Sequence, residues 1–270
     1  MPTHQEKATR FLELHRGETP LLMPNPWDLG SARLLESLGF QALATTSSGF
    51  AATLGQLDGS VTRDEAIAHG TAMAGAVDVP VSADLENCFA DSPEGVAETV
   101  GMALAAGLAG CSVEDFDRDG DQIYDFGLAR ERVAAAAEAA HAAVHLVLTA
   151  RTESALHGDR DLGRIIARLQ AFQEAGADVL FAPGVVAPDD VRQVVSSVDR
   201  PVNVLALPGC PPVAGLAELG VARISVGGAF AWTALGAVVN AGRALLDQGT
   251  YDYWDLAGPG GQAARAAFKR

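Results

Sequence analysis

Short apolar runs rich in β-branched residues alternate with longer stretches of helical periodicity from one end of the chain to the other. Ser92 followed by Pro93 is typical of a helix start, and Gly39, Gly107 and Gly176 fall where helices are expected to end. Strands that alternate with helices indicate a parallel sheet. Eight apolar runs predict strands, at residues 21–25, 41–46, 79–84, 110–115, 145–151, 178–183, 202–207 and 223–228.

Eight strand-helix units predict an α/β fold, a (β/α)8 barrel of the TIM type. We also expect an extra N-terminal helix over residues 4–15 and a C-terminal helical extension after Gly249. The length of 270 residues is close to that of one such barrel, so we predict a single domain over residues 1–270. A doubly wound sheet is the alternative, but the first turn, PNPWDLGS, lacks the GxGxxG pattern of a dinucleotide site.

Composition narrows the class of protein. With 49% hydrophobic and 20% charged residues, the chain can bury a large core. Its formal net charge of -15 argues against nucleic acid and anionic membrane surfaces as partners. Gly, Asp, Arg and His interrupt every apolar run before about 18 residues, and the N-terminus lacks the apolar region of a signal peptide. We therefore expect a cytoplasmic protein. The three cysteines have no spacing typical of a disulfide framework or a zinc site.

Carboxylates gather at the predicted strand ends, where the reactive groups of such barrels lie. Alternation along an extended strand places Ser82, Asp84 and Glu86 on one face; Glu114 ends the next strand, and Asp58 follows the second. Clustered carboxylates hold a cation or share protons, and all-oxygen ligands suit Mg²⁺, with Mn²⁺ as a substitute. The alternative is that each carboxylate caps a helix or pairs with an arginine.

Arg151 ends the fifth strand and is suited to grip a substrate carboxylate with two parallel hydrogen bonds. Its alternative role is a structural ion pair with Glu153 or Glu114. The small-residue turn TTSSG at 45–49 has backbone N–H groups that could hold a carboxylate. Trp27 and Asn203 lie at the ends of two further strands. These residues predict a site for a small anion.

The stretches PNPWDLGSARLLESLGF, ATTSSGFAATLGQLD, PVSADLEN, GCSVED and LTARTE occur in an order that resembles the isocitrate lyase and phosphoenolpyruvate mutase superfamily, over about residues 20 to 230. The resemblance implies an α/β barrel that assembles as dimers or tetramers, with the last helix exchanged between paired subunits. It also implies a Mg²⁺ site and chemistry at a 2-oxo or 2-hydroxy carboxylate through an enolate-like intermediate.

Site residues follow from the same resemblance. Asp84 matches the second Asp of the D-A-D motif, whereas Ser82 stands where a metal-ligating Asp is usual, and Glu86 is the candidate to replace that carboxylate. The metal ligands implied are Asp58, Asp84, Glu86 and Glu114. The substrate-binding residues expected are Trp27, Thr45, Thr46, Ser47, Arg151 and Asn203. The catalytic residues expected are Asp58, Glu114, Tyr124 and Arg151.

The sequence departs from the superfamily after Asp115. Isocitrate and methylisocitrate lyases carry there a mobile loop with a K-[KR]-C-G-H motif whose Cys donates a proton, whereas this chain reads FDRDGDQIYDFG. This difference argues against ordinary isocitrate or methylisocitrate lyase activity. Tyr124, Arg118 and a bound water are alternative proton donors, and Tyr124 is preferred because a phenol can deliver a proton if the loop closes.

The sequence therefore predicts a Mg²⁺-dependent lyase that cleaves or forms a C–C bond in a small 2-oxo or 2-hydroxy acid. One alternative is a hydrolase of oxaloacetate-like or phosphonopyruvate-like substrates. Another is a non-catalytic protein that binds a 2-oxo acid. A phosphate-binding barrel, indicated by Gly227 and Gly228 after the last strand, is disfavoured by the acidic mouth.

Overall fold

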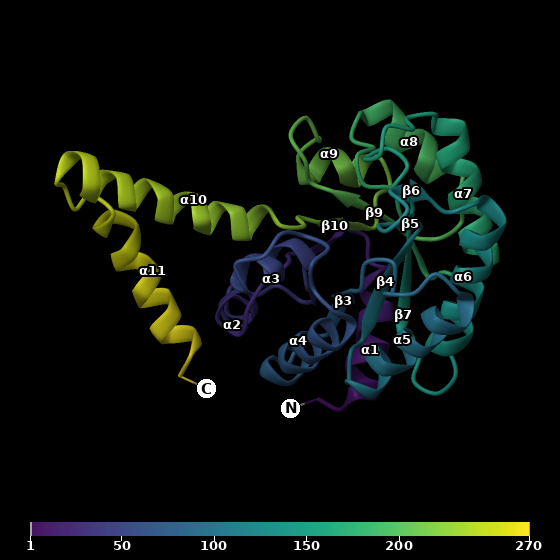
Figure 1. The fold of residues 1–270 in the computed structure, drawn as a ribbon, viewed down its shortest axis with the longest axis horizontal. Helices are drawn as coiled ribbons and strands as arrows, with labels where there is room; N and C mark the ends of the chain where they lie inside the picture. The colour runs from purple at the N-terminus through teal and green to yellow at the C-terminus, as the bar shows by residue number, and fades with distance from the viewer. Residues whose placement is uncertain (1, 270) are drawn as a thin grey trace.

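Eight parallel strands form one curved sheet in the computed structural model, which describes residues 2–269 (Figure 1). The sheet order is β1-β10-β9-β8-β7-β4-β3-β2. From β2 to β10, neighbouring strands of the barrel are consecutive along the chain, except that the β5–β6 hairpin is inserted between β4 and β7, and the first strand, β1, pairs with the last, β10. The eight strands are β1 (Leu21–Met23), β2 (Leu43–Ala44), β3 (Val81–Asp84), β4 (Gly110–Glu114), β7 (Val147–Arg151), β8 (Val179–Phe181), β9 (Val202–Leu205) and β10 (Arg223–Ser225). The hairpin strands are β5 (Phe116–Asp117) and β6 (Gln122–Ile123).

The barrel is nearly closed between its two terminal strands, β1 and β2. The Ala44 N–H donates to the carbonyl of Pro24 at 3.1 Å. Asn25 adds side-chain bonds, because its Nδ2 donates to the Thr45 carbonyl at 2.9 Å and its Oδ1 accepts from the backbone N–H groups of Val226 and Gly227. One amide thus joins three strand ends at the barrel mouth.

Eleven α-helices lie within residues 2–269. They are α1 (His4–Leu14), α2 (Leu29–Ser37), α3 (Ser47–Thr53), α4 (Arg63–Ala76), α5 (Pro93–Ala105), α6 (Phe126–Ala140), α7 (Leu162–Glu174), α8 (Pro188–Ser196), α9 (Val213–Glu218), α10 (Ala229–Arg243) and α11 (Trp254–Ala267). Helix α10 continues into a π-helical turn, η1 (Ala244–Gln248).

The predicted barrel is confirmed: all eight expected strands form, each at its expected place, although most are shorter than the apolar runs. Ser92 caps α5 with Pro93 in its first turn, and Gly39, Gly107 and Gly176 have the positive φ angles of helix ends. The sequence did not predict the β5–β6 hairpin or the short helix α3, which precedes α4 after β2. The helices cover the outside of the barrel, and α1 covers its amino end, where Phe11 is fully buried.

The C-terminal part of the chain forms an arm that leaves the barrel (Figure 1). Helix α10 projects outward, and α11 turns back until the ring of Phe268 lies beside Gly30 of α2. Within the 20 residues Ala229–Gln248, a window of 18 residues has a mean hydropathy of 1.3, and 6% of that window is buried. This one helix among the described residues is long and apolar enough to span a membrane by length and composition, although Arg243 and Asp247 interrupt it.

Candidate active site

A cavity of about 190 Å³ opens at the carboxyl ends of the strands. Its walls include Asp58, Asp84, Arg151, Asn203 and Arg223. A larger cavity, of about 670 Å³, lies at the opposite end of the barrel beside α1 and the start of β1, and it contains none of the predicted site residues. The smaller cavity is the candidate active site because the predicted polar groups meet there.

Asp84 is fixed in this cavity by hydrogen bonds with two residues that follow β2. Its Oδ2 accepts from the backbone N–H and the hydroxyl of Ser47, at 3.1 and 3.0 Å, and its own N–H donates to Thr45 Oγ1 at 2.8 Å. Thr46 caps α3 by accepting from Gly49 N–H. Thr45, Thr46 and Ser47 line the cavity, and their role in holding a substrate carboxylate stays a prediction. The Ser47 amide, however, is used by Asp84, so it holds the carboxylate of the protein.

Arg151 lies among three carboxylates at the end of β7. Its Nε and Nη2 donate to Glu153, the second at 3.0 Å, and its Nε is 3.4 Å from Glu114 Oε2. Its Nη1 lies 3.9 Å from Asp84 Oδ1. Burial lowers the pKa of Arg151, but Glu114 and Glu153 raise it more, so the net shift is upward. Arg151 therefore makes the structural ion pairs of the alternative role and also lines the cavity, and its grip on a substrate carboxylate stays a prediction.

Arg118, from the β5–β6 hairpin, reaches the centre of a second carboxylate group. Its Nε is 2.7 Å from Glu86 Oε2, and its Nη2 is 3.7 Å from Glu114 Oε1 and 3.8 Å from Asp58 Oδ2. Burial raises the pKa of Glu86 to about 7, although the charge of Arg118 opposes the shift. Burial also raises the pKa of Glu114, and there the charge of Arg151 opposes the shift. The sequence contained one signal for this contact, an arginine four residues after Glu114.

These oxygen donors fit a hard divalent cation, the kind of ion that superfamily enzymes typically use. The fit rests on three carboxylates, Asp58, Glu86 and Glu114, that already converge on one positive group. Burial without full neutralisation leaves the two glutamates with raised pKa values, and a cation bound between them would lower both. The guanidinium of Arg118 occupies the position between them.

Glu86 is not where strand alternation predicts it. Strand β3 ends at Asp84, and Glu86 has a positive φ of 53°, so the chain has already turned. Its carboxylate points to Arg118 and is absent from the cavity wall, where Ser82 and Asp84 remain. Glu114 also lies behind Arg151 and outside the wall. The shared face expected for Ser82, Asp84 and Glu86 is therefore corrected to Ser82 and Asp84 alone.

Tyr124 and Trp27 also lie away from the cavity wall. The Tyr124 hydroxyl donates to Asp91 Oδ1 at 2.5 Å and accepts from Asn87 Nδ2 at 3.1 Å. Burial, reinforced by the bond to Asp91, raises the pKa of Tyr124 to about 12. In this structure Tyr124 donates its proton to Asp91 and lies outside the cavity wall, so its role as proton donor stays a prediction that requires the loop to move. Trp27 precedes α2 and packs beside Gly49.

Arg223 is a site residue that sequence reasoning missed. It begins β10, is 2% exposed and lies in the cavity wall. It donates to Asn203 Oδ1 and Thr149 Oγ1, both at 3.0 Å, and lies 3.2 Å from His15 Nε2. No carboxylate of residues 2–269 forms an ion pair with it, and burial lowers its pKa to about 9. The available signal was a charged residue in an otherwise apolar strand, RISV.

The fold and the site together define the class of protein, an α/β barrel with a cluster of carboxylates and arginines at its mouth. The family model described as phosphoenolpyruvate phosphomutase matches residues 11–246. The chain belongs to the phosphoenolpyruvate mutase and isocitrate lyase superfamily, which confirms the resemblance seen in the sequence. Members of this superfamily are lyases and mutases that act on small carboxylic acids.

Three relatives illustrate the similarity. A solved structure of a candidate lyase/mutase from Burkholderia cenocepacia J2315 is 45% identical, with a TM-score of 0.93, and the match covers 97% of this chain and 95% of that one. The structure of 2,3-dimethylmalate lyase is 29% identical, with a TM-score of 0.82, over 93% and 90% of the two chains. A Corynebacterium glutamicum protein named probable 2-methylisocitrate lyase 2 is 29% identical over 74% of this chain and 66% of its own.

Proposed function

We propose that the protein is a Mg²⁺-dependent lyase that cleaves or forms a C–C bond in a small 2-oxo or 2-hydroxy carboxylic acid, through an enolate-like intermediate. One observation carries the proposal: Arg151 and Asp84 lie side by side in the wall of a cavity at the carboxyl ends of the strands. A cation beside a carboxylate can orient an anionic substrate and hold a counter-ion at the same place. The names of the two lyase relatives agree with this chemistry.

We infer that the substrate is small and carries two anionic groups. The cavity volume of about 190 Å³ equals that of about six water molecules, at roughly 30 Å³ each. Two arginines line it at different depths, Arg151 at the end of β7 and Arg223 at the start of β10. Arg223 is a buried cation with neutral partners, and a carboxylate placed near it would offset the cost of its burial.

Asp58, Asp84, Glu86 and Glu114 are the residues that would hold Mg²⁺. When bound, Mg²⁺ would supply the positive charge that stabilises an enolate. Arg118 would have to leave the carboxylates first, and its place on a short hairpin allows such a movement. Ser47 and Thr45 keep Asp84 in position throughout, because their bonds to it come from the barrel and from α3.

Arg118 also supports a second candidate function, a non-catalytic protein that binds a 2-oxo acid. Its guanidinium partly neutralises the carboxylates that would otherwise hold a metal, and Ser82 provides no carboxylate on the β3 face. A protein of this kind would bind an acid through Arg151 without a divalent ion and would not convert it. The same experiment separates the two functions.

The test is a calorimetric titration with pyruvate, oxaloacetate, 2-oxoglutarate, glyoxylate and 2,3-dimethylmalate, each with Mg²⁺ and with EDTA, followed by product analysis. The lyase proposal expects Mg²⁺-dependent binding and C–C cleavage of at least one acid. Asp84→Asn should abolish turnover, and Arg151→Lys should weaken binding at least tenfold because the planar guanidinium fork is lost. Asp190→Asn, an exposed control on α8, should change neither turnover nor binding.

Binding of an acid in EDTA without turnover would support the second candidate, the non-catalytic protein. Acid products that contain a solvent oxygen would indicate a hydrolase, and no binding by any acid would refute both.

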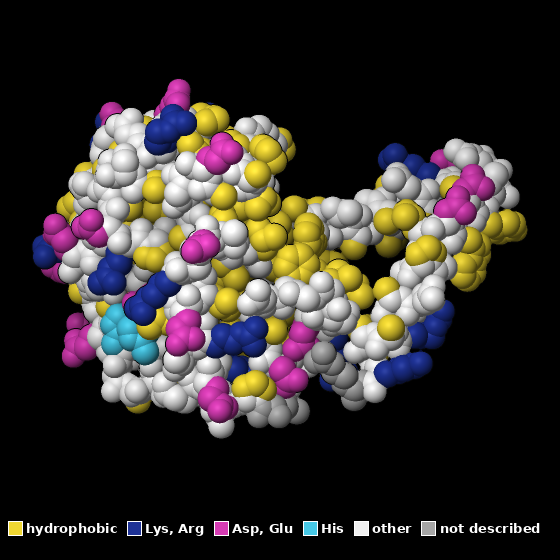
Figure 2. Space-filling model, turned by 180° about the vertical axis from the view of Figure 1, so that it is seen from behind, with side chains coloured by type: hydrophobic (Ala, Val, Ile, Leu, Met, Phe, Trp, Pro, Cys, Tyr) yellow, Lys and Arg dark blue, Asp and Glu magenta, His cyan; other side chains and the backbone are white. Residues whose placement is uncertain are grey.

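We also propose that the protein is a homo-oligomer, a dimer or tetramer, in which a second copy covers the C-terminal arm. Hydrophobic side chains gather where α10 leaves the barrel and along the arm (Figure 2). Leu246 and Leu256 on the arm are 86% and 70% exposed. Soluble monomers rarely expose contiguous hydrophobic patches of this kind. Light scattering should give a multiple of 27.9 kDa for the wild type and a smaller particle for Leu246→Asp, with Leu57→Asp as the control on an exposed loop. A monomer that floats with liposomes would instead indicate a membrane contact.

A further inference from the structure

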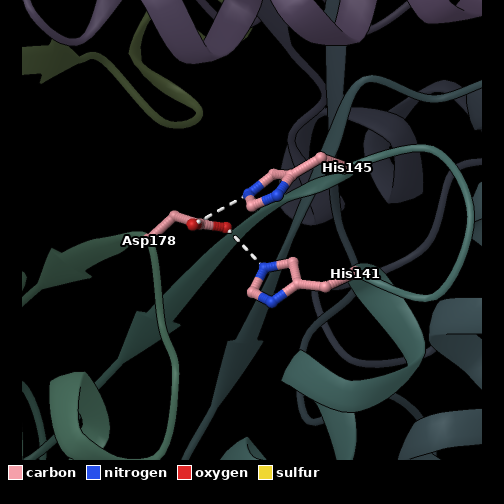
Figure 3. A group of neighbouring side chains, drawn as sticks. All are labelled: His141, His145 and Asp178. Carbon is pink, nitrogen blue, oxygen red and sulfur yellow. Dashed lines mark hydrogen bonds and ion pairs between the residues drawn. The ribbon is translucent and has the colours of Figure 1, made fainter.

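A cluster of two histidines and one aspartate lies at the end of the barrel opposite the candidate active site (Figure 3). His141 directly follows α6, His145 precedes β7, and Asp178 precedes β8. These positions are at the amino ends of the strands, so the cluster takes no part in the chemistry of the mouth. We propose that His141, His145 and Asp178 form a binding site for a divalent transition-metal ion such as Zn²⁺.

The three side chains already converge. His141 Nε2 lies 3.0 Å from Asp178 Oδ2, and His145 Nε2 lies 3.0 Å from Asp178 Oδ1 (Figure 3). One ligand atom from each residue lies within 4.8 Å of the other two. Zn²⁺ bonds of about 2.0–2.1 Å place two ligands of a tetrahedral site about 3.3 Å apart. The two 3.0 Å pairs are within a few tenths of an ångström of this spacing, whereas ligand atoms as far as 4.8 Å apart would have to approach by up to about 1.5 Å to share one ion.

The chemistry and surroundings of the cluster select the kind of ion. Two imidazole nitrogens with one carboxylate oxygen suit Zn²⁺, Co²⁺ or Ni²⁺, whereas Mg²⁺ prefers oxygen ligands. Asp178 is 8% exposed and its Oδ2 also accepts from Leu148 N–H at 2.9 Å, which fixes the carboxylate as an outer partner fixes a metal ligand. The side chains of His141 and His145 are 29% and 42% exposed, so an ion can enter from solvent and water can complete its coordination.

A bound ion would join three segments that the chain otherwise connects only through the barrel, the end of α6 and the starts of β7 and β8. The rings of His141 and His145 stack, with centroids 4.1 Å apart and 19° between their planes, so both edges face the same carboxylate. The net charge of -15 attracts cations in general but does not choose among them. Selectivity for Zn²⁺ over Mg²⁺ would therefore come from the imidazoles.

The experiment is a titration of the full chain with Zn²⁺ and with Co²⁺, read by calorimetry and by visible absorption of Co²⁺, with a Mg²⁺ titration as comparison. The wild type should bind one equivalent that His141→Ala/His145→Ala loses, together with the intense absorption of four-coordinate Co²⁺. His145→Asn, which can still donate a hydrogen bond to Asp178, should weaken binding at least tenfold and guards against misfolding of the double variant. His157→Ala, an exposed histidine after β7, is the matched control and should bind like the wild type. Equal binding by the double variant and the wild type, or no binding by the wild type, would show that the histidines only anchor Asp178.

Discussion

Replacing Glu86 by glutamine should stabilise the metal-free protein at alkaline pH. Burial raises the pKa of Glu86 from 4.5 to about 7, even though Arg118 lies 2.7 Å away and opposes the shift. A carboxyl with a raised pKa in the folded state favours folding only while it is protonated. Its contribution is complete below about pH 4.5 and is lost as the pH rises through about 7.

The size of the effect follows from the shift. A rise from 4.5 to about 7 corresponds to about 3 kcal/mol, at about 1.4 kcal/mol per unit of pKa. A glutamine side chain keeps the shape of the glutamate and cannot ionise, so the variant avoids this loss. For a chain of this size, 1 kcal/mol changes the melting temperature by roughly 2–4 °C. We expect Glu86→Gln to melt about 6–12 °C above the wild type at pH 8 and within about 2 °C of it at pH 4.5.

Differential scanning calorimetry in EDTA at pH 4.5, 6, 7 and 8 measures this difference. Glu138→Gln, an exposed glutamate on α6, controls for the loss of one negative charge from an acidic chain. A difference between Glu86→Gln and the wild type that does not change with pH would refute the reasoning, because it would not come from a titration. A variant less stable than the wild type at pH 8 would show that the ion pair with Arg118 outweighs the cost of burial.

Two further predictions concern Arg118 and Arg223. Arg118→Gln should increase the affinity for Mg²⁺ about tenfold, or about 1.4 kcal/mol, because the guanidinium no longer competes for Glu86 and Glu114. The rise in melting temperature on adding Mg²⁺ at pH 8 measures this affinity. A rise equal to that of the wild type would contradict the prediction. Arg223→Met should raise the KM for a dianionic acid at least tenfold. The ligand-free variant should be at least as stable as the wild type, because a buried cation is removed. Lower stability with an unchanged KM would show that Arg223 is purely structural.

The sequence predicted the barrel because each strand is an apolar run and each helix has its own start and end signals. It also placed Asp84 and Arg151 correctly, since both lie on the strands themselves. It failed one or two residues beyond a strand end. Alternation stops where the backbone turns, so Glu86 left the expected face, and Tyr124 found a partner in Asp91 that no local pattern indicates.

Arg223 and Arg118 show a different limit, because their roles depend on contacts between distant segments. Arg223 meets Thr149 and His15, which lie 74 and 208 residues away along the chain. A charged residue at the start of an apolar strand indicates an unusual position but not its partners. Arg118 depends on the register of a hairpin whose strands have two residues each and which pairs Asp117 with Gln122. Neither arrangement follows from composition or periodicity.

The charges at the mouth connect the metal proposal to pH. Five carboxylates and two guanidinium groups meet there, namely Asp58, Asp84, Glu86, Glu114 and Glu153 with Arg118 and Arg151. Five negative and two positive charges leave a formal charge of -3, and one proton on each of the two glutamates with raised pKa reduces it to -1. A divalent cation that displaced both protons and the guanidinium of Arg118 would leave a formal charge of -2. Mg²⁺ binding should therefore release protons below about pH 7 and strengthen as the pH rises, which calorimetry in buffers of different ionisation enthalpy can measure.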